Sequence, residues 1–164
     1  MNKKTVYLTQ GAVIAAAYVA LTYVSAALGL ASGAIQVRLS EVLTILPVFT
    51  PAAVPGLYIG CLLANLLTGC ALWDVVFGSV ATLLGAVGTY FIGRKNKWLA
   101  PVFPIAANVL IVPPILMYVY GSPDSWPFLC LTVGIGEIVS CGILGLLLHR
   151  LVEKTGVFKL KASK

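Results

Sequence analysis

Charged residues are scarce in this 164-residue sequence, where only 10% of residues are Asp, Glu, Lys or Arg. A soluble domain carries roughly 25%. Hydrophobic residues make up 60% of the chain, and the mean hydropathy is +1.00. A soluble fold of this length could not bury so much apolar surface, so lipid must be the solvent for most of it. The composition predicts an all-α integral membrane protein with a single domain over residues 1–164.

The motifs of several enzyme classes are also missing. There is no G-x-x-x-x-G-K-[ST] phosphate loop, so the chain cannot itself be the ATPase of a pump. There is no nucleophile elbow, and His149 has no serine partner at membrane depth. None of the four cysteines belongs to a C-x-x-C pair, so neither a metal site nor a cofactor is expected. The four cysteines are expected to be small apolar side chains of helices; Cys70 and Cys130 could both lie near the outer face, but nothing in the sequence supports a disulfide between them.

The few charges are sorted along the chain. Basic residues cluster at the N-terminus, at 94–97 and after residue 149, with long uncharged stretches between them. Because the bases flank apolar stretches, the net charge of +6 indicates contact with anionic lipid headgroups rather than with nucleic acid. The positive-inside rule places all three clusters on the cytoplasmic side.

The number of membrane crossings follows from this charge pattern. Four stretches with at most one charged residue each predict helices of about the 20 residues that a crossing needs, at approximately 5–29, 74–93, 98–120 and 126–149. The intervening segment is broken by three prolines, and a single crossing there would put the later basic clusters outside. It therefore predicts two helices, at 38–48 and 53–70. The total is six transmembrane helices, with both termini cytoplasmic. The short second helix leaves a cavity near the outer face that the loop 30–37 could cover.

Small residues recur at every fourth position in three of these helices. One stripe is Ala12, Ala16 and Ala20 in the first helix; another begins at Gly56 and Gly60 in the third. Such stripes allow helices to approach closely. Packing within the bundle explains each of them, but the stripe of the first helix could instead dock a partner subunit.

Seven side chains are candidates for a ligand site near or within the membrane: Arg38, Glu41, Asn65, Trp73, Asp74, Asn108 and Glu137. A charge at the centre of a membrane helix costs about 3 kcal/mol or more, so a functional reason is expected for it. Several of these side chains could instead have a purely structural role. Glu137 could lock two helices when protonated or paired, and Arg38 and Glu41 could form an i, i+3 ion pair. The asparagines could bridge helices, and Trp73 could anchor the interface.

Acids, amides and aromatic rings together suit a planar heterocycle with several N–H donors. One carboxylate, such as Glu137, can accept two hydrogen bonds from a guanine-like edge, and Gly134 and Gly136 would let the ring approach the backbone. Either Asp74 or Glu41 would neutralise a ligand amine. The two asparagines would orient the ring, and Trp73 would stack on it. Pro113 and Pro114 are expected to disrupt the helix after Asn108 and to free carbonyls that need partners.

An ordered set of motifs runs along the chain: residues 38–41 (RLSE), 49–56 (FTPAAVPG), 64–69 (ANLLTG), 73–78 (WDVVFG), 98–101 (WLAP), Asn108 and Gly136-Glu137. Together these motifs resemble the queuosine-precursor transporter family of the QueT type. These proteins are substrate-binding S components of energy-coupling factor (ECF) transporters. The resemblance implies a six-helix bundle in the bacterial cell membrane and a pocket that opens outward beneath the first loop.

The resemblance also implies a ligand and partners. The ligand is a 7-deazaguanine, such as the aminomethyl or cyano precursor of queuosine, or queuine. The partners are a membrane coupling subunit, docked through Ala12 and Ala16, and two cytoplasmic ATPase subunits. Three alternatives stay open: an S component for another vitamin such as a flavin or thiamin, an independent secondary carrier, and a structural membrane protein without a ligand.

Overall fold

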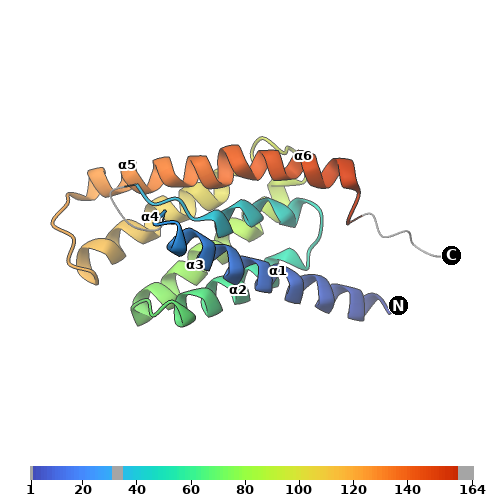
Figure 1. Cartoon of the computed structure of the whole chain (residues 1–164). Helices are drawn as coiled ribbons and strands as arrows, with labels where there is room; N and C mark the ends of the chain where they lie inside the picture. The colour runs from blue at the N-terminus through green and yellow to red at the C-terminus, as the bar shows by residue number, and fades with distance from the viewer. Residues whose placement is uncertain (1, 31–34, 159–164) are drawn as a thin grey trace.

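The computed structural model describes residues 2–30 and 35–158, and every regular element in these residues is a helix. The elements run in chain order α1 (Lys3–Ala27), η1 (Leu39–Val48), α2 (Ala53–Leu67), α3 (Leu72–Gly88), η2 (Thr89–Gly93), α4 (Val102–Tyr118), α5 (Trp126–Glu137), η3 (Ile138–Leu144) and α6 (Gly145–Thr155). They lie side by side in an elongated bundle (Figure 1). The expected all-α bundle is confirmed.

Three helical stretches are long and apolar enough to cross a membrane: Lys3–Ala27, Leu72–Gly93 and Trp126–Thr155. The other three apolar helices, η1, α2 and α4, have 10 to 17 residues. The third long stretch is one continuous rod, because α5, η3 and α6 follow one another without a break. Long apolar helices of this kind are those of a membrane protein, as the composition predicts.

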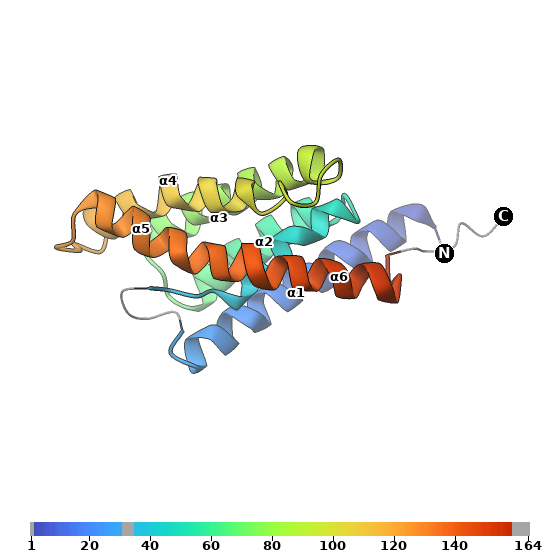
Figure 2. The same cartoon turned by 90° about the horizontal axis from the view of Figure 1, so that it is seen from above.

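The two ends of the bundle differ in what they carry. The start of α1 and the end of α6 lie at one end, together with the turns at 49–52 and 94–101 (Figures 1 and 2). An ion pair there joins Lys97 to Glu153, with a nitrogen–oxygen distance of 3.9 Å. The turns at 68–71 and 119–125 lie at the opposite end. The basic clusters within the described residues are therefore gathered at one end.

The short element η1 runs through the middle of the bundle. It is a 3-10 helix, and seven of its ten residues are buried, Glu41 among them. It contacts α1, α6 and η3, and its apolar side chains join those of α1 and α2 in the main core. Ser25 fixes its start, since the Ser25 hydroxyl accepts a hydrogen bond of 2.8 Å from the Leu39 amide. A ten-residue element thus brings an acid into the centre of the protein.

Glycine allows α1 and α2 to pack in close contact. A Cβ placed on Gly56 would lie 2.7 Å from the Gly11 carbonyl oxygen, and one on Gly60 would lie 2.8 Å from the Tyr18 Cβ. Such distances are well below van der Waals contact, so only glycine fits at these two positions. This part of the small-residue pattern serves packing within the chain.

The double proline does not interrupt α4, contrary to the expectation from sequence. The helix continues through Pro113 and Pro114 to Tyr118. Proline at position 113 removes the N–H that would bond to the Val109 carbonyl. That carbonyl instead accepts a hydrogen bond of 3.6 Å from the Cys130 thiol on α5. The helix persists because a neighbouring helix supplies a donor to the freed Val109 carbonyl. Cys130 and Cys70 are both free thiols, so no disulfide joins them.

Candidate functional site

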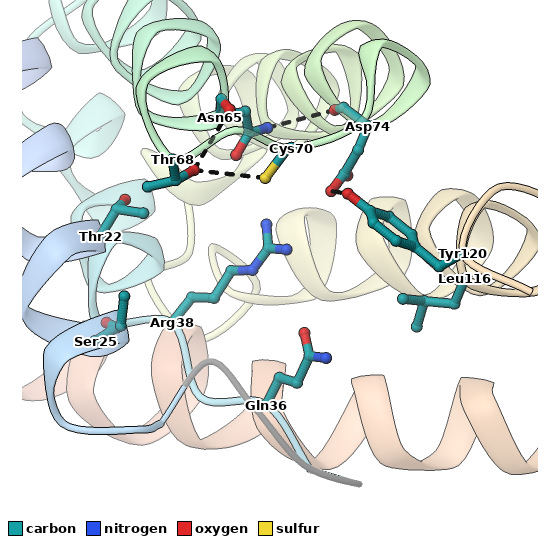
Figure 3. A pocket seen from close by; sticks show the side chains of 11 residues that line it. Thr22, Ser25, Gln36, Arg38, Asn65, Thr68, Cys70, Asp74, Leu116 and Tyr120 are labelled. Atoms are coloured by element: carbon teal, nitrogen blue, oxygen red, sulfur yellow. Dashed lines mark hydrogen bonds between the residues drawn. The ribbon is translucent and has the colours of Figure 1, made fainter. Parts of the chain in front are cut away.

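One candidate site is a pocket of about 390 Å³ at the end of the bundle that carries the turns 68–71 and 119–125 (Figure 3). This volume lies within the range of about 300–1,000 Å³ that small-molecule pockets occupy. Eleven residues line it: Thr22, Ser25, Ala26, Gln36, Arg38, Asn65, Thr68, Cys70, Asp74, Leu116 and Tyr120. Three of the seven predicted site residues, Arg38, Asn65 and Asp74, are therefore brought together from the residue before η1, from α2 and from α3.

Arg38 provides the unpaired donor group of this pocket. Its half-buried side chain extends into the centre of the pocket with the guanidinium pointing toward Cys70 (Figure 3). Among the described residues, no hydrogen bond or ion pair is formed by the guanidinium, and the i, i+3 pair with Glu41 is not made. A guanidinium has five N–H donors in a planar fork. It can thus donate to a carbonyl or an anion that enters the pocket.

Asp74 faces Arg38 across the pocket and is held in place by Tyr120. The Tyr120 hydroxyl donates a hydrogen bond of 3.1 Å to Asp74 Oδ2 and accepts one of 3.1 Å from the Ala71 amide. Burial is the largest of the causes that raise the pKa of Tyr120 to about 12, so at neutral pH the phenol keeps the proton that it donates. Sequence reasoning missed Tyr120, because an aromatic residue near the membrane interface is normally an anchor.

Asn65 is anchored to the same helix start as Asp74. Its side-chain nitrogen donates to the Asp74 carbonyl oxygen at 3.4 Å and to the Cys61 sulfur at 3.6 Å. Thr68, one turn later, donates to the Ala64 carbonyl and lies 3.5 Å from the Cys70 sulfur. These bonds hold the polar wall formed by α2 and the turn that follows it, which leaves the Arg38 side free to contact a ligand.

A second group of predicted residues lies deeper in the bundle. Oxygen atoms of Glu41 and Glu137 and the Cys141 sulfur lie within 4.8 Å of one another. Tyr18 on α1 donates a hydrogen bond to Glu41, and the Cys141 thiol donates one of 3.1 Å to Glu137. Thr44 donates to the Glu41 carbonyl at 2.6 Å. Two carboxylates are thus adjacent in the buried interior of the bundle.

A cavity of about 20 Å³ lies against this second group. Gln36, Arg38, Asn108, Val112, Val133 and Glu137 line it. Asn108 is 5% exposed and its side-chain nitrogen has no hydrogen-bond partner in the described part of the chain; the same is true of Glu41 Oε2, in a side chain that is 2% exposed. Gln36 and Arg38 line both this cavity and the main pocket. The two groups of predicted residues therefore meet at Arg38.

The structure does not bring Trp73 to the pocket. Its side chain is 60% exposed and stacks on Phe77, with 5.7 Å between ring centroids, and it does not line the pocket. The glycines beside Glu137 also differ from expectation. A Cβ on Gly136 would overlap the Gln36 carbonyl oxygen, so the chain itself occupies the space that was expected to admit a planar ligand.

Two expectations concern other surfaces. Ala12 and Ala16 are exposed on α1, on the side away from α2, where a partner or lipid can reach them. In the loop that was expected to cover the cavity, residues 31–34 lie outside the described residues, as do residues 159–164 of the basic C-terminal tail.

Apolar helices of membrane-spanning length, together with a polar pocket at one end, define a membrane protein built to accept a small molecule. The comparison with protein families is specific: the QueT transporter model matches residues 8–154. The chain belongs to the QueT transporter family, which confirms the resemblance seen in the motifs. A search of curated proteins and a search of solved structures gave no match.

Proposed function

We propose that this protein is the substrate-binding S component of an ECF-type importer that captures a 7-deazaguanine outside the cell. The observation that carries the proposal is an unpaired guanidinium, Arg38, facing a tyrosine-held carboxylate, Asp74, in a pocket of about 390 Å³ in a transporter-family protein. The chain performs no chemistry on the ligand. Energy comes from a membrane coupling subunit and two cytoplasmic ATPase subunits, since the sequence has no phosphate loop.

The proposed topology is six crossings, with both termini on the cytoplasmic side. All three basic clusters then face the cytoplasm, and the pocket faces outward. The three shorter helices cross with their ends below the membrane surface. They can do so because they pack against the long helices rather than standing alone in lipid. Ala12 and Ala16 present small side chains to the coupling subunit.

The ligand edges match the two sides of the main pocket. Asp74 accepts the adjacent ring N–H and exocyclic amine of the guanine-like edge as a bidentate pair. Arg38 donates to the ring carbonyl, as arginine does to guanine O6, but without a second bond at position 7, where a 7-deazaguanine has carbon instead of nitrogen. Asn65 positions the Asp74 turn. In this arrangement Asp74 takes the role that the sequence indicated for Glu137, because Asp74 lines the cavity that is large enough for a ring.

Calorimetric titration of the purified protein in detergent tests the ligand class. We expect saturable binding of 7-deazaguanines, with no measurable binding of riboflavin or thiamin at the same concentrations. A vitamin that binds more tightly than every deazaguanine would make the protein an S component of another specificity. The absence of saturable binding for the whole panel would contradict a capture function.

Uptake into cells separates an ECF subunit from an independent carrier. We expect accumulation of a labelled deazaguanine only when the coupling subunit and both ATPases are co-expressed, and no effect of a protonophore while ATP is maintained. The Ala16→Trp variant is expected to bind ligand normally but to lose uptake, because a large side chain blocks close approach of a partner helix. Leu110→Trp, on the exposed side of α4, is the control. Uptake by this chain alone would contradict the ECF assignment.

A further inference from the structure

The turn between η2 and α4, residues 94–101, carries three bases at the basic end of the bundle, the end where α1 begins and α6 ends (Figures 1 and 2). Its backbone is held against the end of the preceding helix. The Thr89 hydroxyl donates a hydrogen bond of 2.9 Å to the Ala100 carbonyl, and a Cβ on Gly93 would lie only 2.7 Å from the Ala100 Cβ. The bases are therefore carried by a backbone that hydrogen bonding and close packing fix in place.

A hollow of about 410 Å³ lies between this turn and α6. Its charged lining consists of Arg94, Lys95, Lys97 and Glu153. These side chains sum to three positive charges and one negative charge, or +2. Lys97 is paired with Glu153 at 3.9 Å. Within the described residues, the side chains of Arg94 and Lys95 form no ion pair or hydrogen bond, and the guanidinium lies 5.0 Å from the Tyr90 ring centroid. Two positive charges are thus left for an anion in the hollow.

One side of the hollow is a buried imidazole, that of His149 on α6. The residue is 5% exposed, and its ring packs against Phe49 with 4.8 Å between centroids. Its Nδ1 has no hydrogen-bond partner within the described residues, since Glu153 Oε2 is 3.8 Å away. Buried polar atoms are normally hydrogen-bonded, so this nitrogen at the edge of a hollow points to a ligand group. The positive-inside rule explains bases at this end, but not the imidazole beside them.

The charge and the size of the hollow indicate a chemical class. A phosphate monoester carries about −1.5 to −2 charge at neutral pH, which matches the charge of the lining, whereas a phosphodiester carries only about half of that. The hollow has more room than one phosphate needs, so the group that bears the phosphate can enter as well. Trp98 also lines it and is 60% exposed. Tryptophan at a membrane surface lies at the level of the lipid headgroups.

We propose that this hollow binds a phosphate monoester, presented either by the headgroup of a phosphatidate lipid or by a free phosphate ester. Arg94 and Lys95 bind the phosphate oxygens, and an N–H at His149 Nδ1 donates to one of them. Lys97 stays paired with Glu153, so that the carboxylate of the lining is already neutralised. The site lies at the opposite end of the bundle from the main pocket, and the inference does not depend on the proposed function.

Native mass spectrometry of the purified full chain in detergent tests the inference. The probes are phosphatidate, phosphatidylglycerol and phosphatidylcholine with the same acyl chains, mixed in equal amounts. We expect one phosphatidate to be retained per chain, at least fivefold more than either other lipid. Retention of either other lipid as strongly as phosphatidate would overturn the inference, because both are diesters.

Titration calorimetry distinguishes the two sources of the phosphate. Glycerol 3-phosphate has the same headgroup as phosphatidate and no acyl chains. Binding within threefold of the affinity of a short-chain phosphatidate would assign the hollow to a free phosphate ester, and weaker binding would assign it to the lipid. Failure of both phosphatidate and glycerol 3-phosphate to bind would overturn the inference.

A pair of double variants tests where the phosphate is bound. Arg94→Gln with Lys95→Gln is expected to lower the retention of phosphatidate at least fivefold. Lys3→Gln with Lys4→Gln removes the same charge from exposed positions at the same end, outside the hollow, and should change retention less than twofold. An equal loss for both double variants would overturn the inference, because it would mean diffuse attraction to charge. Melting temperatures show that both variants are folded, and the lipid comparison needs no variant.

Discussion

At the scale of the residue, Arg38 is exceptional because its charge faces a cavity instead of a protein partner. Asp74 has a hydrogen bond from Tyr120, and Glu41 has one from Tyr18. Arg38 has neither a hydrogen bond nor an ion pair within the described residues, although it lies between the main pocket and the small cavity. A cation held between acids without a direct bond is kept available for the ligand.

We expect Arg38→Gln to weaken deazaguanine binding by roughly 10- to 100-fold, because a hydrogen bond to a charged group contributes about 1.5–3 kcal/mol. Titration calorimetry measures the effect. Arg150→Gln removes an exposed arginine of α6 outside both cavities and should change affinity less than twofold. If Arg38→Gln kept its melting temperature and bound ligand as tightly as the parent protein, Arg38 would have no role in recognition.

The sequence indicates most of these side chains, but not which of them line the main pocket and which line the small cavity. An acid or amide in an apolar stretch is conspicuous, which is why Asn65, Asp74 and Glu137 could be proposed from the chain alone. The sequence could not reveal that Asp74 lines a large cavity and Glu137 a small one, because that depends on where η1 lies. Nor could it distinguish Tyr120, which supports a carboxylate, from Trp73, which stacks on Phe77.

At the scale of the element, the position of the segment before η1 depends on one glycine of α5. The Gln36 carbonyl lies against Gly136 so closely that a Cβ at this position would overlap it. Gln36 also lines the main pocket and the small cavity. The position of the Gln36 backbone therefore sets the wall between the main pocket and the small cavity. Sequence reasoning reserved the same glycine for a ligand, because a pattern of small residues does not state what approaches it.

Gly136→Ala is expected to lower the free energy of unfolding by about 1–3 kcal/mol, the usual cost of overpacking, and to weaken ligand binding because Gln36 must move. Thermal unfolding in detergent and calorimetry give the two values. Gly134→Ala is a matched control on the same helix, since its nearest neighbour, Val109 Cγ2, would lie at an ordinary 3.5 Å. Equal melting temperatures for both variants would mean that the 35–38 backbone yields without cost.

At the scale of the whole molecule, the two ends of the bundle have different electrostatic character. The end with Lys97 and Glu153 also carries Arg94, whose guanidinium lies 5.0 Å from the Tyr90 ring centroid. The other end carries Asp74 and the exposed Asp124. The charge pattern of the sequence could indicate this division because it depends only on the order of charges. The sequence predicts one helix over 126–149, where the structure has a continuous rod from Trp126 to Thr155, but the order of charges could not place η1 in the interior.

Cysteine labelling in intact cells tests the orientation. With the four natural cysteines replaced, Asp124→Cys should react with a membrane-impermeant maleimide. Lys95→Cys should react only after the cells are permeabilised, because the positive-inside rule places its turn in the cytoplasm. Both positions are exposed, so access to the side chain does not limit either reaction. Labelling of both positions in intact cells, or the reverse pattern, would contradict the proposed topology.

The π-helical turn at η3 gives the long C-terminal rod a mechanical property. It begins immediately after Glu137, and its wider winding continues to Leu144, where α6 starts. One residue of an α-helix corresponds to a rotation of about 100°. If this wide turn tightened by one residue, every side chain of α6 would swing around the helix axis by that amount. Any change in the winding of η3 would therefore turn the face that α6 presents at the basic end of the bundle.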